Sequence, residues 1–323
     1  MRTLAVLCSD IHLCHTCPPA RSAEPDWYEA MKRLLDQLED VKSSYGAPIL
    51  CSGDVFDRWN SPPELINFAI ENLPVVYAIP GQHDLPYHEL SSIRKSAYWT
   101  LVEAGKICDV RSSSFGQPSS SSSSSSFSSL IVGKKLIVDG YPWGTEIKVG
   151  RSTTSCDGSS SANKLLHVAL VHKYVWTMGK GYPGAPEEGK TINFSMPGYD
   201  VAVFGDNHQS FYTRCDGGSV VVNPGCLIPR KSDERGIGSS VYLLKEDKSI
   251  ERVRLDTSED KWIETDDVKT AEAELSGMQD FLDEMRSLDS DSLDFEAAVR
   301  KYCTDNKVSK QTERLVLESM GAE

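Results

Sequence analysis

Residue types that bind divalent cations or move protons recur through the first two thirds of the chain. They occur in short clusters, two with D-x-H spacing, and comprise Asp10, His12, Asp54, Gln82, His83, Asp84, His172, Asp206 and His208. Carboxylates, imidazoles and amide oxygens are ligands that divalent metals accept. Two such cations can bring the pKa of a bridging water near neutrality, giving a hydroxide nucleophile, and clamp the oxygens of a phosphoester. The residue types therefore predict a two-metal site for phosphoester hydrolysis.

The elements that must position these residues are expected to be short buried strands. Each cluster follows an apolar stretch of strand length, at residues 4–8, 48–51, 75–79, 165–171 and 201–204. In an open α/β sheet, ligands bind outside the carboxyl ends of the strands. We therefore expect segments far apart in sequence to meet at one sheet edge and to form the site there.

Helices are expected between the first strands. Apolar residues at helical spacing predict helices at 27–42, capped by Asp26, from Pro62–Pro63 onward, and at 91–104. This β-α-β-α-β order predicts a parallel sheet. Further short strands are expected at 130–132 and 136–138, and an antiparallel set at 211–214, 219–222, 241–244 and 250–255.

Composition divides the chain into two predicted regions. Residues 112–129 and 150–162 are rich in serine, so we expect flexible surface loops there. The tail is acidic and carries apolar stripes at helical spacing. We predict a catalytic domain at residues 1–258, which contains both loops, and an acidic helical region at 259–323 that could bind a partner.

Charge and hydropathy exclude some functional classes. The formal net charge of −13 at pH 7 argues against a broad phosphate-binding surface, although bound cations can reverse the charge locally. No apolar run of about 18 residues occurs, and the first residues do not resemble a secretory signal. The nine cysteines are expected to be reduced, and the lone C-x-x-C of Cys14 and Cys17 favours a surface loop over a zinc site. We expect a cytoplasmic protein.

The clusters follow the order of a known signature. Asp10-Ile11-His12, Gly53–Asp57, Gly81–Asp84, His172 and Gly205–His208 resemble the D-x-H, G-D-x-x-D, G-N-H-[DE], H and G-H-x-H motifs of calcineurin-like metallophosphoesterases. Asn223-Pro224-Gly225 is similar to a turn that closes that family's core, and the resemblance covers roughly residues 1–255. It implies an α/β fold, the four-layer αββα sandwich with two mixed β-sheets, and a small helical C-terminal appendage.

The resemblance also implies a role for each matching residue. One cation would be held by Asp10, His12, Asp54 and His208, and the other by Asp54, Gln82, His172 and Asp206. His83 would contact the phosphate and protonate the leaving oxygen, and Asp84 would orient the His83 imidazole. Asp57 would support the ligands from outside.

Two expected ligands depart from the family pattern. Gln82 replaces an asparagine and Asp206 replaces a histidine, and both still offer oxygen. An anionic, oxygen-rich site favours Mn²⁺, or Mg²⁺, over metals that prefer imidazole. The departures leave open whether the second cation binds weakly.

Within this superfamily, the chain looks most like SbcD-type DNA repair nuclease subunits, including short forms from bacterial viruses. The likeness rests on Gly53–Asp57 followed by Ser61-Pro62-Pro63, and on Gly81–Asp84. It implies a DNA phosphodiesterase that works with a coiled-coil ATPase of the SbcC type, and the chain could also form a homodimer. Two alternatives stay open: a phosphatase or small-molecule phosphodiesterase of the same fold, and a partner-binding protein without turnover. Pro80 stands where protein phosphatases carry arginine.

Overall fold

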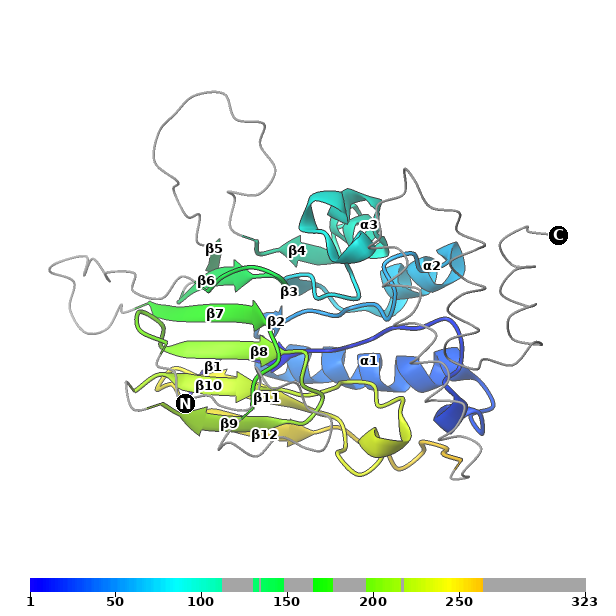
Figure 1. Ribbon diagram of the computed structural model, residues 1–323. Coiled ribbons are helices and arrows are strands. Elements are labelled where there is room, and N and C mark those ends of the chain that lie inside the picture. Colours follow the sequence, from blue (N-terminus) through cyan, green and yellow to red (C-terminus); the bar gives the residue numbers. More distant parts are fainter. Residues whose placement is uncertain (112–129, 134, 148–164, 177–195, 216–217, 264–323) are drawn as a thin grey trace, which may run out of the picture. The chain divides into compact units, whose positions relative to one another are not determined.

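The computed structural model describes residues 1–111, 130–133, 135–147, 165–176, 196–215 and 218–263, which belong to one compact unit, Met1–Glu272. The described residues form helices α1 (Trp27–Tyr45), α2 (Pro63–Asn72) and α3 (Ala97–Glu103) and two six-stranded sheets (Figure 1). No helix in these ranges has the length and apolar character needed to cross a membrane. The expected serine-rich loops and, beyond residue 263, the expected C-terminal helices lie outside the described residues.

The first sheet contains the β-α-β-α-β segment. Its order is β12-β11-β1-β2-β3-β4. The strands are β1 (Thr3–Cys8), β2 (Ile49–Cys51), β3 (Val76–Ala78), β4 (Ile107–Asp109), β11 (Ser240–Lys245) and β12 (Ile250–Arg254). β1 to β4 are parallel, whereas β11 pairs antiparallel with both β1 and β12.

Helices cover one face of this sheet. The Asp26 carboxylate accepts hydrogen bonds from the amides of Tyr28 and Glu29, which satisfies free donors at the start of α1. The helix ends at Gly46, whose φ of 55° is the left-handed conformation that favours glycine. The buried stripe of α1 packs in one cluster with α2, α3 and β1 and comprises Met31, Leu34, Leu35 and Leu38.

The second sheet has the order β5-β6-β7-β8-β10-β9. Its strands are β5 (Leu130–Val132), β6 (Leu136–Tyr141), β7 (Leu166–His172), β8 (Val201–Gly205), β9 (Phe211–Arg214) and β10 (Val220–Asn223). The four central strands are parallel, and the two edge strands are antiparallel to their neighbours. Both sheets are therefore mixed.

The two sheets pack face to face. Ala5 and Leu7 of β1 lie in one apolar cluster with Leu170 of β7 and Val203 of β8, while Val6 of β1 joins the cluster on the helical side. This alternation is the period of two expected of a strand with both faces buried. It sets the carboxyl ends of β1 and β2 beside those of β7 and β8.

The predicted α/β fold with two mixed sheets is confirmed. The described residues supply a helical layer and both sheet layers, and they include no second helical layer. Strand β4 was not predicted, and the late strands are not one antiparallel set: β10 pairs parallel with β8, and β11 and β12 join the first sheet. Apolar pattern shows that a strand is buried, but it does not specify which neighbour the strand will pair with.

Candidate metal centre

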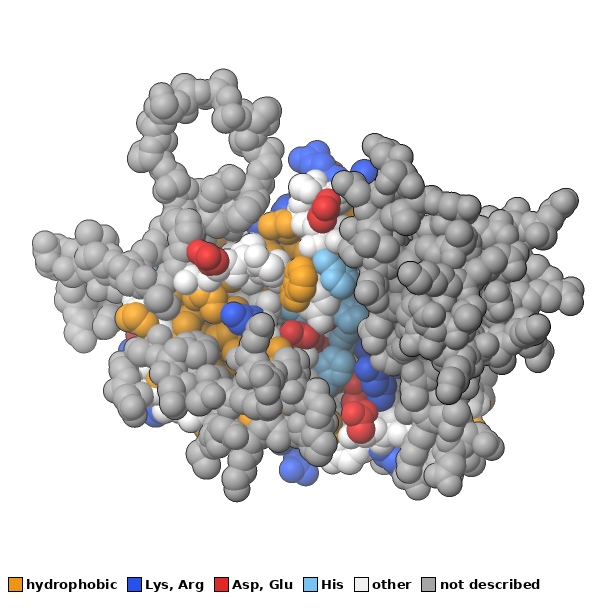
Figure 2. All heavy atoms as spheres, viewed as in Figure 1, with side chains coloured by type: hydrophobic (Ala, Val, Ile, Leu, Met, Phe, Trp, Pro, Cys, Tyr) orange, Lys and Arg blue, Asp and Glu red, His pale blue; other side chains and the backbone are white. Residues whose placement is uncertain are grey.

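Strand ends from both sheets bring the expected ligands together at one edge. These residues come from the loops after β1 (Asp10 and His12), β2 (Asp54), β3 (Gln82 and His83) and β8 (Asp206 and His208), and from the end of β7 (His172). On the face shown in Figure 2, histidine side chains gather beside acidic ones. Segments distant in sequence therefore converge as the strand pattern predicts.

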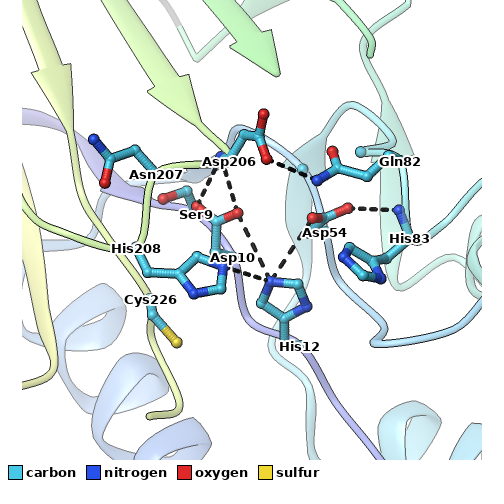
Figure 3. Close-up of polar contacts among 12 residues, drawn as sticks. Ser9, Asp10, His12, Asp54, Gln82, His83, Asp206, Asn207, His208 and Cys226 are labelled. Carbon is cyan, nitrogen blue, oxygen red and sulfur yellow. Dashed lines mark hydrogen bonds and ion pairs between the residues drawn. The ribbon is translucent and has the colours of Figure 1, made fainter. Parts of the chain in front are cut away.

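Asp10, His12 and His208 form one group of ligand atoms, which lie within 4.8 Å of one another. The imidazoles of His12 and His208 point toward each other in Figure 3, with their Nε2 atoms 3.1 Å apart. Two ligands at about 2.0–2.1 Å from one cation lie about 2.9–3.4 Å apart at octahedral or tetrahedral angles. The spacing therefore fits two nitrogen ligands of a single cation.

Asp54 lies between this group and a second one. Its Oδ2 atom is 3.7 Å from His12 Nε2 and 3.3 Å from His172 Nε2. Ligand atoms of Asp10, Asp54 and His172 also lie within 4.8 Å of one another. Asp54 thus faces imidazoles from both sheets, which is where a carboxylate that bridges two cations must be.

Several buried ligand atoms at this edge have no hydrogen-bond partner. Within the described part of the chain, they include Asp54 Oδ2, Gln82 Oε1 and His172 Nε2. Leaving a buried polar atom unpaired costs about 1–3 kcal/mol, so three in one place need a reason. Cations held between these atoms would satisfy them. The residues present therefore fit the binding of divalent metals.

A family model described as calcineurin-like phosphoesterase matches residues 4–210, a range that includes all seven expected metal ligands. The chain belongs to the calcineurin-like phosphoesterase family. This is the family that the order of the sequence motifs indicated. No curated protein sequence matches the chain.

Solved structures similar to this phosphoesterase have low sequence identity to it. The sulfate thiohydrolase SoxB of Thermus thermophilus has 14% identity and a TM-score of 0.42, with 87% of this chain and 62% of that chain covered. A metallophosphoesterase from Sphaerobacter thermophilus has 15% identity and a TM-score of 0.34, with 79% and 90% covered. Vps29 from Entamoeba histolytica, complexed with zinc, has 13% identity and a TM-score of 0.34, with 78% and 99% covered. The chain thus spans less than two thirds of the length of SoxB.

The backbone of this phosphoesterase is strained at four expected ligands. Asp10, His12, Asp54 and Asp206 have φ values of 48°, 52°, 52° and 81°. Each such conformation costs a non-glycine residue about 1–3 kcal/mol and persists where its surroundings fix it. Here the amide of Asp10 donates to Gly53 O and that of His12 to Asp54 O, both at 3.0 Å. The strain aims the side chains inward from the ends of the strands.

Glycine is required at two positions beside the ligands. A Cβ at Gly53, whose φ is 108°, would lie 2.3 Å from His172 Nδ1, and one at Gly81 would lie 2.1 Å from Asp54 Oδ1. No side chain fits in either place, because both contacts are far shorter than van der Waals distance. These glycines let the loops after β2 and β3 close around Asp54.

Burial and neighbouring charges shift the pKa values of this site. Burial raises the pKa of Asp10 to about 6. Burial would also raise the pKa of Asp54, but His172 and His83 together outweigh it and the pKa falls to about 2. Burial alone would lower the pKa of His172, yet the Asp54 carboxylate beside it raises the pKa well above its usual value. Concentrated carboxylate charge of this kind attracts cations.

The two residues that depart from the family pattern contact each other. Gln82 Nε2 donates a hydrogen bond of 2.7 Å to Asp206 Oδ1 across 124 positions of sequence (Figure 3). This bond fixes the amide so that Gln82 Oε1, buried and unpaired, is the atom left for a cation. Asp206 also receives support, because its amide donates to both carboxylate oxygens of Asp10, at 3.0 and 3.2 Å.

We expect Gln82 and Asp206 to be energetically coupled in cation binding. Gln82→Asn shortens the side chain by one methylene and Asp206→His removes the carboxylate, so each single change should weaken the second cation. The double variant has the pair of residues that is usual in the family. Its loss of binding free energy for that cation should be smaller than the sum of the losses in the two single variants, by about 0.5–3 kcal/mol. Calorimetric titration with Mn²⁺ measures this; strictly additive losses would show that the two residues act independently.

Hydrogen bonds to residues outside the expected ligand set orient two of the imidazoles. His172 Nδ1 donates to Ser52 O at 2.6 Å, which leaves Nε2 as the ligand atom. His208 Nδ1 lies 2.6 Å from Glu234 Oε1, in the short helix η6 (Ser232–Glu234). Burial would lower the pKa of His208, but the Glu234 carboxylate outweighs burial and raises it. Such partners fix the tautomer of a metal-binding histidine.

Glu234→Gln should weaken cation binding about 10- to 100-fold, because the charge that orients His208 and makes it more basic is lost. Calorimetric titration with Mn²⁺ would give the affinity. Glu64→Gln serves as a matched control, since its side chain is 72% exposed. An unchanged affinity in the Glu234 variant would show that His208 needs no such support.

His83 and Asp84 occupy the site loop after β3, but they do not form the expected pair. The Asp84 carboxylate accepts hydrogen bonds from the amides of Val55, Phe56 and Gly81 at 2.9–3.1 Å. The His83 imidazole instead donates through Nδ1 to Asp57 O, at 2.9 Å. The prediction that Asp84 orients His83 is therefore wrong: Asp84 ties the loop after β3 to the loop after β2, and a backbone carbonyl orients the imidazole.

Asp57 lies just outside the ligands, as expected. Its Oδ1 atom is 3.9 Å from His12 Nδ1 and forms an ion pair with the buried guanidinium of Arg230. Burial would raise the pKa of Asp57, but Arg230 outweighs it and lowers the pKa. Arg230 and Glu234 were not identified from the sequence, because they lie in the connection between β10 and β11, with no predicted strand directly before them.

The Asn223–Gly225 turn supports the loop that carries His208. Asn223 Nδ2 donates to the carbonyls of Asn207 and Gln209, at 2.6 and 2.9 Å. The Cys226 amide donates to His208 O at 3.1 Å. The turn thus fixes the backbone on both sides of His208, an expected metal ligand.

Proposed function

We propose that this chain hydrolyses phosphodiesters in DNA and uses two divalent cations, preferably Mn²⁺. The position of Asp54 carries the proposal. Its Oδ2 atom, which has no hydrogen-bond partner among the described residues, faces His12 on one side and His172 on the other. A carboxylate so placed fits two cations that it shares.

Different residues of the chain would bind the cations and protonate the leaving oxygen. Two bound cations would lower the pKa of a water molecule and offset the charge that builds up on phosphate oxygens. Asp10, Asp54 and the imidazoles of His12, His172 and His208 would hold the cations. His83, fixed through Nδ1 by Asp57 O, keeps Nε2 for the substrate and can give a proton there to the leaving oxygen.

Charge near the site favours a diester over a monoester. A phosphomonoester dianion carries one more negative charge than a diester and gains more from free arginines. Arg230, which acts electrostatically on His12 and His208, is already paired with Asp57. Pro80 precedes Gly81, so no arginine stands there either. With three carboxylates at the site, the monoanionic diester is the better substrate.

Purified protein loaded with Mn²⁺ tests the proposal. We expect it to hydrolyse single- or double-stranded DNA and methyl p-nitrophenyl phosphate, a diester, faster than p-nitrophenyl phosphate, the matched monoester. Mg²⁺ should support less activity and chelation should abolish it. Preference for the monoester would contradict the proposal.

We also keep a coiled-coil ATPase as the proposed partner, following the resemblance to SbcD-type subunits. The C-terminal region expected to bind it comprises residues 259–323, and all of it beyond residue 263 lies outside the described residues. ATP-dependent stimulation of DNA hydrolysis by such a subunit would support the partnership. Activity that does not change when the subunit is added would count against it.

A further inference from the structure

Four aromatic side chains, the aromatic rim, lie on segments that leave the metal centre: Trp59, Tyr87, His88 and Trp143. Trp59 is two residues beyond Asp57, and Tyr87 is four residues beyond His83. The amide of Trp143 donates to Pro80 O, just before Gly81, at 3.4 Å. Since a residue spans at most about 3.6 Å, these rings are tethered close to the site.

The rings of the rim contact one another in two pairs. The ring centroids of Trp59 and Tyr87 are 5.6 Å apart, with the planes at 50°. Those of His88 and Trp143 are 5.2 Å apart and nearly perpendicular. Tyr87 and His88 are neighbours in sequence, so the same short segment contributes a ring to each pair. Figure 2 shows hydrophobic side chains bordering the histidines on the face drawn there.

Tyr87 is held out in solvent by a strained backbone. Its side chain is 53% exposed, an uncommon position for a large aromatic residue. Tyr87 and His88 have φ values of 55° and 59°, so two consecutive residues other than glycine are left-handed. Strain of this kind clusters at ligand-binding sites. Exposure and strain together indicate that the ring is kept available for a ligand.

The negative net charge of the chain favours binding of a ligand at the aromatic rim by stacking rather than by broad electrostatic attraction. Arg58, between Asp57 and Trp59, is exposed, but the chain as a whole carries a net charge of −13. Broad electrostatic attraction to a nucleic acid is therefore weak. Stacking of a base on an aromatic ring does not depend on such electrostatic attraction. Every nucleobase has a flat face that can stack in this way.

We infer that the aromatic rim, with Tyr87 at its outer face, binds a nucleobase next to the scissile phosphate. The inference rests on the proposed DNA phosphodiesterase function and extends it by naming a base-binding subsite. The ligand is an unpaired base of single-stranded or frayed DNA, because a base inside a duplex is already stacked on its neighbours.

The test compares two diesters with the same leaving group, thymidine 5′-(p-nitrophenyl phosphate) and methyl p-nitrophenyl phosphate. Tyr87→Ala should lower the ratio of their kcat/KM values about 5- to 100-fold, mainly through KM of the nucleotide ester. Tyr87→Phe keeps the ring and should keep the ratio. Tyr45→Ala is the matched control, since Tyr45 is 42% exposed and ends α1, at the amino ends of the strands.

A second measurement does not depend on turnover. Mn²⁺-loaded protein should bind a hydrolysis-resistant phosphorothioate oligothymidylate more tightly than an abasic oligomer of the same length. Tyr87→Ala should remove this difference. If wild-type protein hydrolysed both diesters but bound both oligomers equally, the base-binding role of the aromatic rim would be wrong, whereas the proposed phosphodiesterase function would stand. Protein that hydrolyses only monoesters and binds neither oligomer would overturn both.

Discussion

Asp54→Ala should abolish binding of the second cation, weaken the first strongly and reduce phosphodiester hydrolysis to background. The change removes the carboxylate that faces both His12 and His172, at 3.7 and 3.3 Å. It also removes the acceptor of the His83 amide, which donates to Asp54 Oδ1 at 3.0 Å. Both expected cations therefore lose Asp54, the ligand that they are expected to share. Calorimetric titration with Mn²⁺ measures the stoichiometry, and hydrolysis of methyl p-nitrophenyl phosphate measures the activity.

The control for this variant is another aspartate removed in the same way. Asp36 lies on α1 with its side chain 55% exposed, so Asp36→Ala should bind both cations with normal affinity. Circular dichroism of both variants checks that the fold is kept. If the Asp54 variant bound two cations as tightly as the Asp36 variant, the bridging role assigned to Asp54 would be wrong.

The placement of the ligands could be predicted because it follows from local pattern. Asp10 and Asp54 each come directly after an apolar stretch of strand length, and parallel strands end at the same edge. His172 ends such a stretch itself. Neither step needs knowledge of side-chain packing. An apolar stretch with the length and the two-residue period of a strand is enough to predict that these segments meet.

The supporting contacts could not be predicted, because they depend on loop conformation. Glu234 reaches His208 from a short 3-10 helix, and no spacing in the sequence links the two. The family resemblance paired Asp84 with His83, yet the Asp84 carboxylate accepts hydrogen bonds from amides of the neighbouring loop. The resemblance therefore assigned the wrong partner to His83, whereas the order of the strands correctly predicted which segments lie close together.

The pair of Gln82 and Asp206 shows what a motif comparison misses. Taken separately, each residue is a departure that could weaken the second cation. Their hydrogen bond shows that the two changes are complementary: the carboxylate accepts the amide nitrogen and leaves the amide oxygen for a cation. A contact across 124 positions is visible only once both sheets are in place.

His83→Ala should preserve cation binding but lower the rate of DNA hydrolysis about 10²- to 10⁴-fold, because general-acid assistance to the leaving oxygen is lost. The imidazole ring centroid is 5.1 Å from that of His12, close enough to reach a phosphate at the cations. Asp57 O holds Nδ1, so the opposite nitrogen faces the substrate. His15→Ala, at a side chain 45% exposed, is the matched control.

The leaving group distinguishes proton donation by His83 from simple contact with the phosphate. The sugar oxygen of DNA is a poor leaving group and needs a proton, whereas p-nitrophenolate leaves without one. The loss in the His83→Ala variant should therefore be large for DNA and much smaller for methyl p-nitrophenyl phosphate. Equal losses for the two substrates, with both cations still bound, would show that His83 only positions the phosphate. Asp84 would not replace His83 as the proton donor, because its carboxylate oxygens already accept hydrogen bonds from the amides of Val55, Phe56 and Gly81.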